Sequence, residues 1–269
     1  MSISVSACEA LNITKTSLKV MSYNILGNMV IEGRPADARQ SMAETVLLND
    51  MDVFGTQEDN PDTFMLDYLE NYSCYKGVDD GNHVYWKTDK FNVIKKGYYY
   101  LSDTPAIKSK YSDSTQYRTL TYIILEVKET GNQFVFVNVQ ADQKSESVRT
   151  KQLEVVGAQL KKLNNDNLPV VFLGDFSTTT TASGSAILDF LADNPNFDNT
   201  SKIAATKKDS SGTVIQDNDF TVRDKKTVVD YIFVTTDNVY TSYYTVVDNV
   251  KDGKYPSDHL PVFVKVDLY

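Results

Sequence analysis

The chain has 269 residues, of which 27 are Lys or Arg and 36 are Asp or Glu, so its formal net charge at pH 7 is −9. With 41% hydrophobic residues, 12 Gly, 7 Pro and 2 Cys, the composition excludes a disordered chain, a collagen and a disulfide-stapled scaffold. An acidic chain repels phosphate backbones, which disfavours tight non-specific binding to duplex nucleic acid. Phosphate chemistry stays open, because a bound divalent cation can supply positive charge.

The N-terminal residues predict an extension over 1–17, followed by a single domain over 18–269. This extension has no basic segment followed by an apolar one, so it does not predict a signal peptide. No apolar run approaches the roughly 18–20 residues that predict a transmembrane helix. The many Tyr, Ser, Thr and Asn residues favour, on composition alone, an exported protein with its signal removed over an intracellular one. Cys8 and Cys74 match no metal-binding spacing, and the sequence leaves open whether they pair.

The first third of the chain alternates strand and helix patterns. Residues 18–26 predict a strand, 36–49 a helix and 52–56 a short buried strand. Asn60 and Pro61 predict the N-cap and first position of a second helix that ends near Glu70.

The middle and last thirds are richer in strands. The middle predicts strands at 75–78, 83–87, 91–101, 119–127 and 134–139. Residues 145–164 predict the clearest helix, and the apolar residues 169–176 are typical of a strand in the middle of a covered sheet. A helix at 183–192 and strands at 228–234, 240–247 and 260–266 follow. The order favours one α/β (α+β) domain with a two-layered β core, and the lack of glycine-rich phosphate motifs argues against Rossmann and P-loop folds.

Polar residues recur where apolar strands end. They are Asn24 in SYN, Glu58 in TQED, Asp175 in LGDFS, Asp230 in VVDYIFV, and Asp258 with His259 in PSDHLP. A single Asp after a buried strand is more often a turn former or a helix cap than a functional group. Their recurrence instead indicates several carboxylates that converge on one site, with the oxygen ligands that hard cations prefer.

In this order the motifs resemble those of the endonuclease/exonuclease/phosphatase superfamily, which shares the fold of deoxyribonuclease I. The matching pieces run from Leu18 to Val264 and read SYNI, GTQE, LGDF, VVDYIFV and SDHLPV. The resemblance implies a four-layered α/β/β/α sandwich, in which two packed mixed β-sheets are flanked by helices.

The resemblance also implies a metal site. Glu58 would bind Mg²⁺ or Mn²⁺, with Asn24 beside it and Asp258 completing or bordering the metal shell. A cation held there would act as a Lewis acid and as a template for a phosphoester.

Catalytic roles follow for three further residues by the same resemblance. Asp175 would orient or deprotonate the attacking water. His259 would contact the scissile phosphate and stabilise the developing charge, while Asp230 would hold its imidazole in one tautomer.

Three positions near these motifs bear on activity. Gln140 stands where most members of the superfamily have a histidine, and Ser177 stands where they have an asparagine. Losing one transition-state donor typically costs about 10²–10³ in rate. Arg118 precedes a central strand, where many members place an arginine that contacts phosphate; a solvated strand-entry charge is the alternative.

Two functions therefore stay open. The first is a metal-dependent phosphoric ester hydrolase, with a phosphodiester as the expected substrate; the second is a degenerate member that binds a ligand or partner. The charge favours a phosphate-containing small molecule or lipid headgroup over nucleic acid, although a nuclease remains an alternative. We expect a monomer. Residues 178–181 predict a solvated turn without clear chemistry, and residues 201–220 predict a loop that shapes substrate access.

Overall fold

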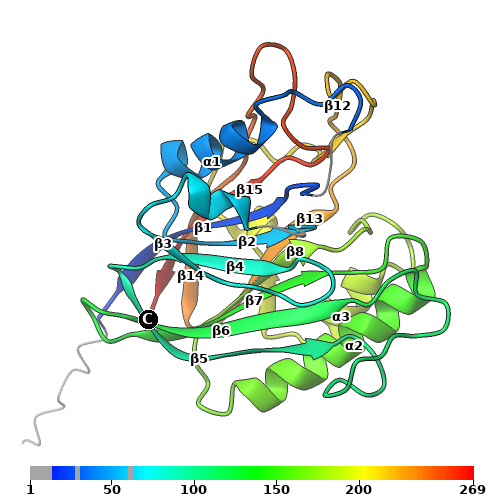
Figure 1. Ribbon diagram of the computed structural model, residues 1–269. Coiled ribbons are helices and arrows are strands. Elements are labelled where there is room, and N and C mark those ends of the chain that lie inside the picture. The colour runs from blue at the N-terminus through cyan, green and yellow to red at the C-terminus, as the bar shows by residue number, and fades with distance from the viewer. Residues whose placement is uncertain (1–13, 28–30, 60–62) are drawn as a thin grey trace, which may run out of the picture.

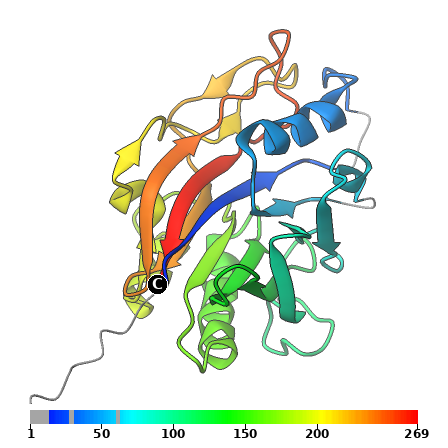
Figure 2. The same cartoon turned by 90° about the vertical axis from the view of Figure 1, so that its left-hand side faces the viewer.

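The computed structural model describes residues 14–27, 31–59 and 63–269, and two mixed β-sheets packed face to face form its centre (Figure 1). The first sheet has the order β10-β14-β15-β1-β2-β4-β3. Its strands are β1 (Thr16–Asn24), β2 (Val53–Gln57), β3 (Tyr72–Tyr75), β4 (His83–Lys87), β10 (Thr206–Lys207), β14 (Val239–Val246) and β15 (Val262–Leu268). Strands β1 and β15, from opposite ends of the chain, pair antiparallel in the middle of this sheet (Figure 2).

The second sheet has the order β5-β6-β7-β8-β13-β9. Its strands are β5 (Phe91–Tyr100), β6 (Thr119–Val127), β7 (Gln133–Gln140), β8 (Val170–Asp175), β9 (Phe197–Asn199) and β13 (Asp230–Thr235). Strands β7 and β8 run parallel, whereas β8 and β13 run antiparallel. A separate ribbon joins β11 (Val214–Ile215) to β12 (Arg223–Asp224).

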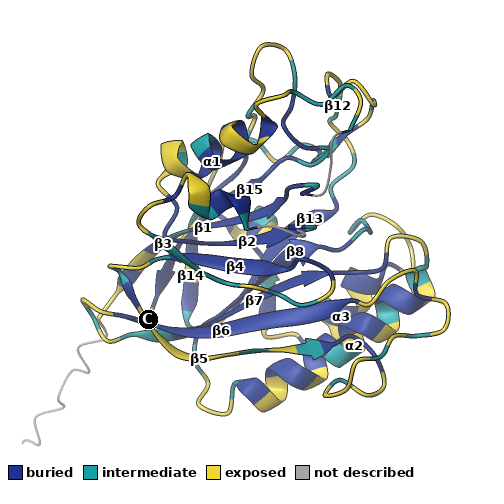
Figure 3. Cartoon of the chain, in the orientation of Figure 1, coloured by how far each residue is buried: buried dark blue, intermediate teal, exposed yellow. Residues whose placement is uncertain are grey.

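Helices cover the outer faces of both sheets. Helix α1 (Ala38–Asn49) and the 3₁₀ turn η1 (Phe64–Asp67) lie on the first sheet, while α2 (Glu146–Leu163) and α3 (Ala186–Asp193) lie on the second. The short helix α4 (Thr200–Ile203) precedes β10. Burial follows these layers, with dark strands between helices whose outer turns are exposed (Figure 3).

Three apolar clusters correspond to the spaces between four layers. Val20, Val53 and Leu173 belong to the cluster between the sheets. Met42 and Phe54 belong to the cluster under α1, and a third cluster fills the space between α2 and the second sheet. The expected four-layered α/β/β/α sandwich is therefore confirmed.

Strand alternation decides which side chains face the space between the sheets. In β8, Val171 and Leu173 belong to the inter-sheet cluster, so Asp175, two residues further on, lies on the same inner face. The same period of two places Asn24, Gln140 and Asp230 on the inner faces of β1, β7 and β13. The site residues thus lie where the inter-sheet core ends.

Asn138 joins the two sheets just below that end. Its side-chain nitrogen donates to the backbone oxygens of Thr56 at 2.7 Å and His83 at 2.8 Å, and its oxygen accepts from Gln57 Nε2 at 2.7 Å. A Cβ added at Gly55 would lie only 2.6 Å from a Leu173 methyl group, so the sheets approach too closely for any larger residue there.

Two predicted elements differ from the structure. The helix expected to end near Glu70 is only the 3₁₀ turn Phe64–Asp67, because a turn that bonds Tyr72 N to Leu69 O starts β3 at once. The strand expected at 75–78 is β3, shifted three residues towards the N-terminus. Asn60 and Pro61 lie outside the described residues, as do Cys8 and most of the predicted extension; β1 begins at Thr16.

Candidate active site

Two carboxylates at the end of the sandwich share the same amide donors. Asn24 Nδ2 lies 3.1 Å from both Glu58 Oε1 and Asp175 Oδ2. Gln140 Nε2 lies 2.5 Å from Glu58 Oε1 and 3.3 Å from Asp175 Oδ2. Glu58 and Asp175 come from different sheets, so these two amides hold together the ends of both sheets.

Ser177 completes the hydrogen bonding of Asp175. Its backbone N–H donates to Asp175 Oδ1 at 2.8 Å, and its hydroxyl lies 3.3 Å from the same oxygen. Each carboxylate oxygen of Asp175 therefore has a donor. This arrangement fixes the direction of the side chain.

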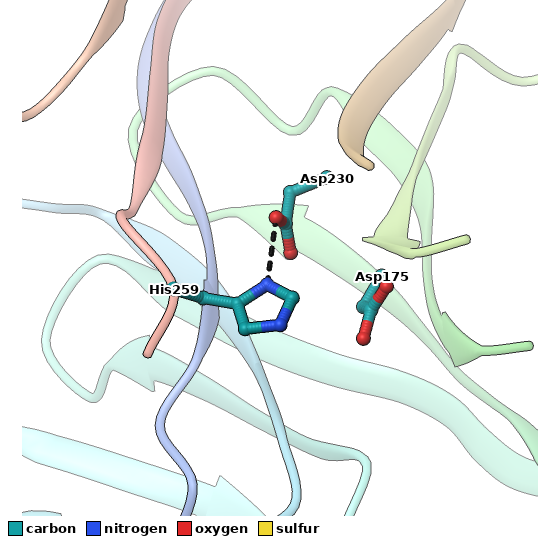
Figure 4. Close-up of side chains that lie close together, drawn as sticks. All are labelled: Asp175, Asp230 and His259. Atoms are coloured by element: carbon teal, nitrogen blue, oxygen red, sulfur yellow. Dashed lines mark hydrogen bonds and ion pairs between the residues drawn. The ribbon is translucent and has the colours of Figure 1, made fainter. Parts of the chain in front are cut away.

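Asp230 and His259 form the second half of the site. Asp230 Oδ2 lies 2.8 Å from His259 Nδ1, while the ligand atoms of Asp175, Asp230 and His259 all lie within 4.8 Å of one another (Figure 4). A carboxylate acceptor at Nδ1 places a proton there. The second ring nitrogen is thus left to face a substrate.

Nearby carboxylates favour the protonated form of His259. Burial alone would lower the pKa of His259, but the charges of Asp230, Asp175 and Asp258 outweigh that effect and hold it well above its usual value. The site therefore contains a positively charged imidazolium beside a cluster of carboxylates.

Arg118 reaches the site through Gln140. Its guanidinium is buried, and Nη1 donates to Gln140 Oε1, which orients the amide nitrogen of Gln140 towards Glu58 and Asp175. Among residues 14–27, 31–59 and 63–269, no group forms a hydrogen bond with Nε or Nη2 of Arg118. Buried orphan donors of a charged group are costly, and they are typical of groups that await a ligand.

The turn that carries Glu58 is strained. Glu58 has φ 59°, in the left-handed region, and its carbonyl accepts from Gly27 N at 2.9 Å. Ser177 likewise has φ 50°. Non-glycine residues in this region are uncommon and concentrate at functional sites.

The segment that carries His259 is fixed by contacts from two other loops. Val214 forms a β-bridge with His259, Ile215 N donates to Asp258 O, and Leu260 N donates to Thr213 O. Arg34 donates to the carbonyls of Ile25, Leu26 and Pro256, which links this segment to the turn after β1.

Asp258 lies at the margin of the site. Its carboxylate accepts from Ser257 Oγ at 3.3 Å and, within the described part of the chain, makes no hydrogen bond with Asn24 or Glu58. Asn24 Oδ1 accepts from Leu26 N at 3.1 Å, so its oxygen is already engaged. The structure thus brings together Glu58 and Asp175, with the Asp230–His259 pair beside them, whereas the proposed metal roles of Asn24 and Asp258 stay predictions.

Two residues near Glu58 did not emerge from the sequence. Gln143 Nε2 lies 3.0 Å from Glu58 Oε1, and no motif indicated it. Asp59 is buried, accepts from Tyr85 OH at 2.6 Å and Thr56 Oγ1 at 3.0 Å, and has a pKa raised by burial to about 7. In the sequence, Asp59 is visible as the second acidic residue of TQED. Its hydrogen bonds with Tyr85 and Thr56 hold the turn that carries Glu58 in place.

An α/β/β/α sandwich with a carboxylate-rich site at one end defines a class of phosphoester-processing proteins. The sequence matches the endonuclease/exonuclease/phosphatase family over residues 21–259. The chain belongs to this family. No curated protein matches the chain by sequence.

Solved structures give the same result. An endonuclease/exonuclease/phosphatase family protein from Bacteroides thetaiotaomicron is similar with a TM-score of 0.80 and 26% identity, over 95% of this chain and 99% of that one. A mannosyl-6-phosphatase from Bacteroides thetaiotaomicron VPI-5482 is similar with a TM-score of 0.79 and 26% identity, over 93% and 99%. The human nocturnin catalytic domain, at 18% identity and a TM-score of 0.73 over 94% and 95%, shares the fold. None of the helices in the described ranges is long and apolar enough to cross a membrane.

Proposed function

We propose that this protein is a divalent-metal-dependent phosphoric ester hydrolase. The observation that carries the proposal is the convergence of the amide-bridged carboxylates Glu58 and Asp175 with the Asp230–His259 pair at one end of the inter-sheet space. Members of the family include phosphatases and nucleases.

The donor set fits a hard cation. Asp175, Asp230 and Asp258 lie near the imidazolium of His259, and Glu58 shares amide donors with Asp175, so negative charge exceeds positive charge in the site. Glu58 would hold Mg²⁺ or Mn²⁺, with Asn24 and Asp258 bordering the metal, since carboxylate oxygens are the ligands these ions prefer. When bound, the ion supplies Lewis-acid polarisation of the phosphoryl group and compensates the charge of the carboxylates.

The protein groups divide the remaining work. Asp175, held by donors on both oxygens, orients a water molecule and accepts its proton. Protonated His259 donates from Nε2 to a phosphoryl oxygen, and Asp230 keeps that nitrogen pointed outward through its bond to Nδ1. The free N–H groups of Arg118 provide further positive charge behind Gln140.

Gln140 and Ser177, the two residues that differ from the family pattern, both contact other residues of the site. Gln140 still bridges Glu58 and Asp175, and Ser177 still donates to Asp175. Both contacts support an active enzyme over the degenerate binding module. Gln140 carries no charge, however, so we expect slower turnover than with a histidine at this position.

A small phosphorylated compound is the substrate class that we propose. The net charge of −9 disfavours long nucleic acid, and one similar structure at 26% identity is named a mannosyl-6-phosphatase. Sugar phosphates therefore come first in a substrate panel, followed by phosphodiesters. A nuclease is the remaining alternative.

Hydrolysis by the purified protein tests this proposal. The panel contains mannose 6-phosphate, bis(p-nitrophenyl) phosphate and a labelled DNA single strand, each with Mg²⁺, Mn²⁺ or a chelator. We expect metal-dependent turnover that falls about 10³-fold in Asp175→Ala, since the general base is removed. Asp189→Ala is the matched control, because Asp189 is an exposed aspartate on α3. A folded protein that cleaves no substrate with either metal would overturn the proposal and favour the binding module.

A further inference from the structure

Three amide side chains donate to a single carboxylate oxygen of Glu58. Asn24 Nδ2 lies 3.1 Å, Gln140 Nε2 2.5 Å and Gln143 Nε2 3.0 Å from Oε1. The other oxygen, Oε2, accepts no hydrogen bond from the described part of the chain. The two oxygens of Glu58 therefore differ, since the protein holds Oε1 and leaves Oε2 available to a ligand.

Asp175, the other carboxylate that these amides bind, has donors on both of its oxygens. Its Oδ2 accepts from Asn24 and Gln140, and its Oδ1 accepts from Ser177 N at 2.8 Å. A cation binds a carboxylate through lone pairs that no N–H group already uses. Of the two carboxylates, Glu58 thus has the oxygen that is free of protein donors.

The three amides that hold Glu58 are not equivalent. Asn24 and Gln140 are buried, and the amide oxygen of each accepts a hydrogen bond of its own, so both are fixed at two points. Gln143 is exposed, and within the described residues its side chain bonds only with Glu58. Gln143 therefore holds Oε1 from the solvent side of the site.

The turn that carries Gln143 is fixed by its neighbour Asp142. Asp142 is fully buried, and its Oδ1 accepts from the backbone nitrogens of Lys144 and Ser145, each at 3.0 Å. Its own backbone nitrogen donates to Gln152 Oε1, on α2, at 2.8 Å. The backbone is thus held on both sides of Gln143, and this exposed side chain extends towards Glu58 from a fixed base.

We propose that Gln143 is a positioning residue of the cation site: together with the two buried amides it holds Oε1 of Glu58 and so directs Oε2 towards a divalent cation. The inference rests on the proposed function and adds to it a residue that acts through Glu58. Replacing a group that orients a metal ligand typically costs about 10–100-fold in metal affinity. Because two donors to Oε1 remain without Gln143, we expect the lower end of this range.

Titration calorimetry with Mn²⁺ measures this role without a substrate. Gln143→Met keeps a neutral, unbranched side chain but has no N–H donor, so the Kd for Mn²⁺ should rise about tenfold, the equivalent of roughly 1.4 kcal/mol. Gln40→Met is the matched control, because Gln40 Nε2 also donates to a glutamate, Glu44, at 2.8 Å and is exposed on α1. It should leave the Kd unchanged. The two variants should have the same thermal unfolding midpoint without metal.

Kinetics separate the positioning of the cation from a direct role in turnover. With whichever substrate the protein hydrolyses, Gln143→Met should raise the Mn²⁺ concentration that gives half the maximal rate by about tenfold. The value of kcat at saturating Mn²⁺ should stay unchanged, because the substitution weakens cation binding and removes no group that contacts the substrate.

The possible outcomes distinguish this inference from the proposed function. An unchanged Kd in Gln143→Met would overturn the inference, and so would a lower Kd, which would mean that the amide competes with the cation; either result leaves the hydrolase intact. If the unsubstituted protein binds no Mn²⁺, the inference fails together with the proposed metal dependence. Mn²⁺ binding that Gln143→Met weakens, in a protein that hydrolyses no substrate, supports the positioning role and overturns only the hydrolase.

Discussion

The site residues on strands and those on loops reach the same place by different physical routes. Gln140, Asp175 and Asp230 end regular strands, and the two-residue period of a strand directs them into the space between the sheets. Glu58 and His259 lie on irregular backbone, held by a left-handed turn and by bridges to other loops. The strand group is therefore positioned by the core, whereas the loop group depends on a few local contacts.

The difference predicts where substitutions affect chemistry and where they affect stability. A change in the strand group acts on a rigid frame and should leave folding intact. A change in the loops or in their anchors should alter local geometry and stability together.

Asp230→Asn should have the largest effect on activity. An amide can present its N–H₂ to His259 Nδ1 and favour the wrong tautomer, so we expect turnover to fall about 10³-fold or more. Thermal unfolding should change little, because the frame of β13 is retained. Activity within tenfold of the unsubstituted protein would show that Asp230 does not orient His259.

Asn138→Ala should have the largest effect on stability. It removes three hydrogen bonds between the sheets, so the carbonyls of Thr56 and His83 and the side-chain amide of Gln57 each lose one bond in the buried core. We expect a loss of about 2–4 kcal/mol in the free energy of unfolding, measured by urea denaturation. Asn92→Ala, on the exposed face of β5, is the control. An equal loss of unfolding free energy in both variants would show that the hydrogen bonds of Asn138 between the sheets do not stabilise the fold.

The ionised form of Asp142 should stabilise the folded protein, and this stabilisation should be lost at low pH. Burial alone would raise the pKa of Asp142, but N–H donors from Thr115, Ser145 and Lys144 outweigh burial and hold it at about 2. The folded-state pKa is thus below the unfolded value of 3.8, and the stabilisation of about 2 kcal/mol is present above pH 3.8 and lost as the pH falls towards 2.

The variant Asp142→Asn checks the sign of this effect. Its deficit in unfolding free energy should be about 2 kcal/mol at pH 7 and should shrink below pH 4. Asp113→Asn, at an exposed position, should show neither effect. A deficit in unfolding free energy that does not change with pH would mean that Asp142 stabilises the fold through its packing and not through its charge.

Ser177→Asn should give the smallest effect, and a favourable one. Asparagine tolerates the left-handed conformation at φ 50° better than serine, so we expect a gain of about 0.5–1 kcal/mol in the free energy of unfolding. Ser183→Asn is the control, because Ser183 lies in the next exposed turn without a positive φ. A loss of stability would mean that the Ser177 hydroxyl bond to Asp175 outweighs the backbone strain.

The sequence predicted the strand half of this site better than the loop half. The apolar runs of β8 and β13 are visible in the residues themselves, and they place Asp175 and Asp230 at strand ends without reference to any relative. Glu58 and His259 also stood out as polar residues beside apolar strands, but their roles depended on the resemblance of GTQE and SDHLPV to family motifs. Gln143 stayed hidden, because its loop meets Glu58 only in the folded chain. The helix expected up to Glu70 was wrong, since β3 begins too soon after it.

The shared inner-face position of the strand residues also limits how this protein can evolve. Inserting or deleting one residue within β7 or β8 would turn Gln140 or Asp175 towards the helices. These strands therefore tolerate substitutions but not changes in length. The loop after β8, residues 176–185, has no such restriction and can vary in length. Changes in that loop can therefore alter the surroundings of the site while the strand residues keep their positions.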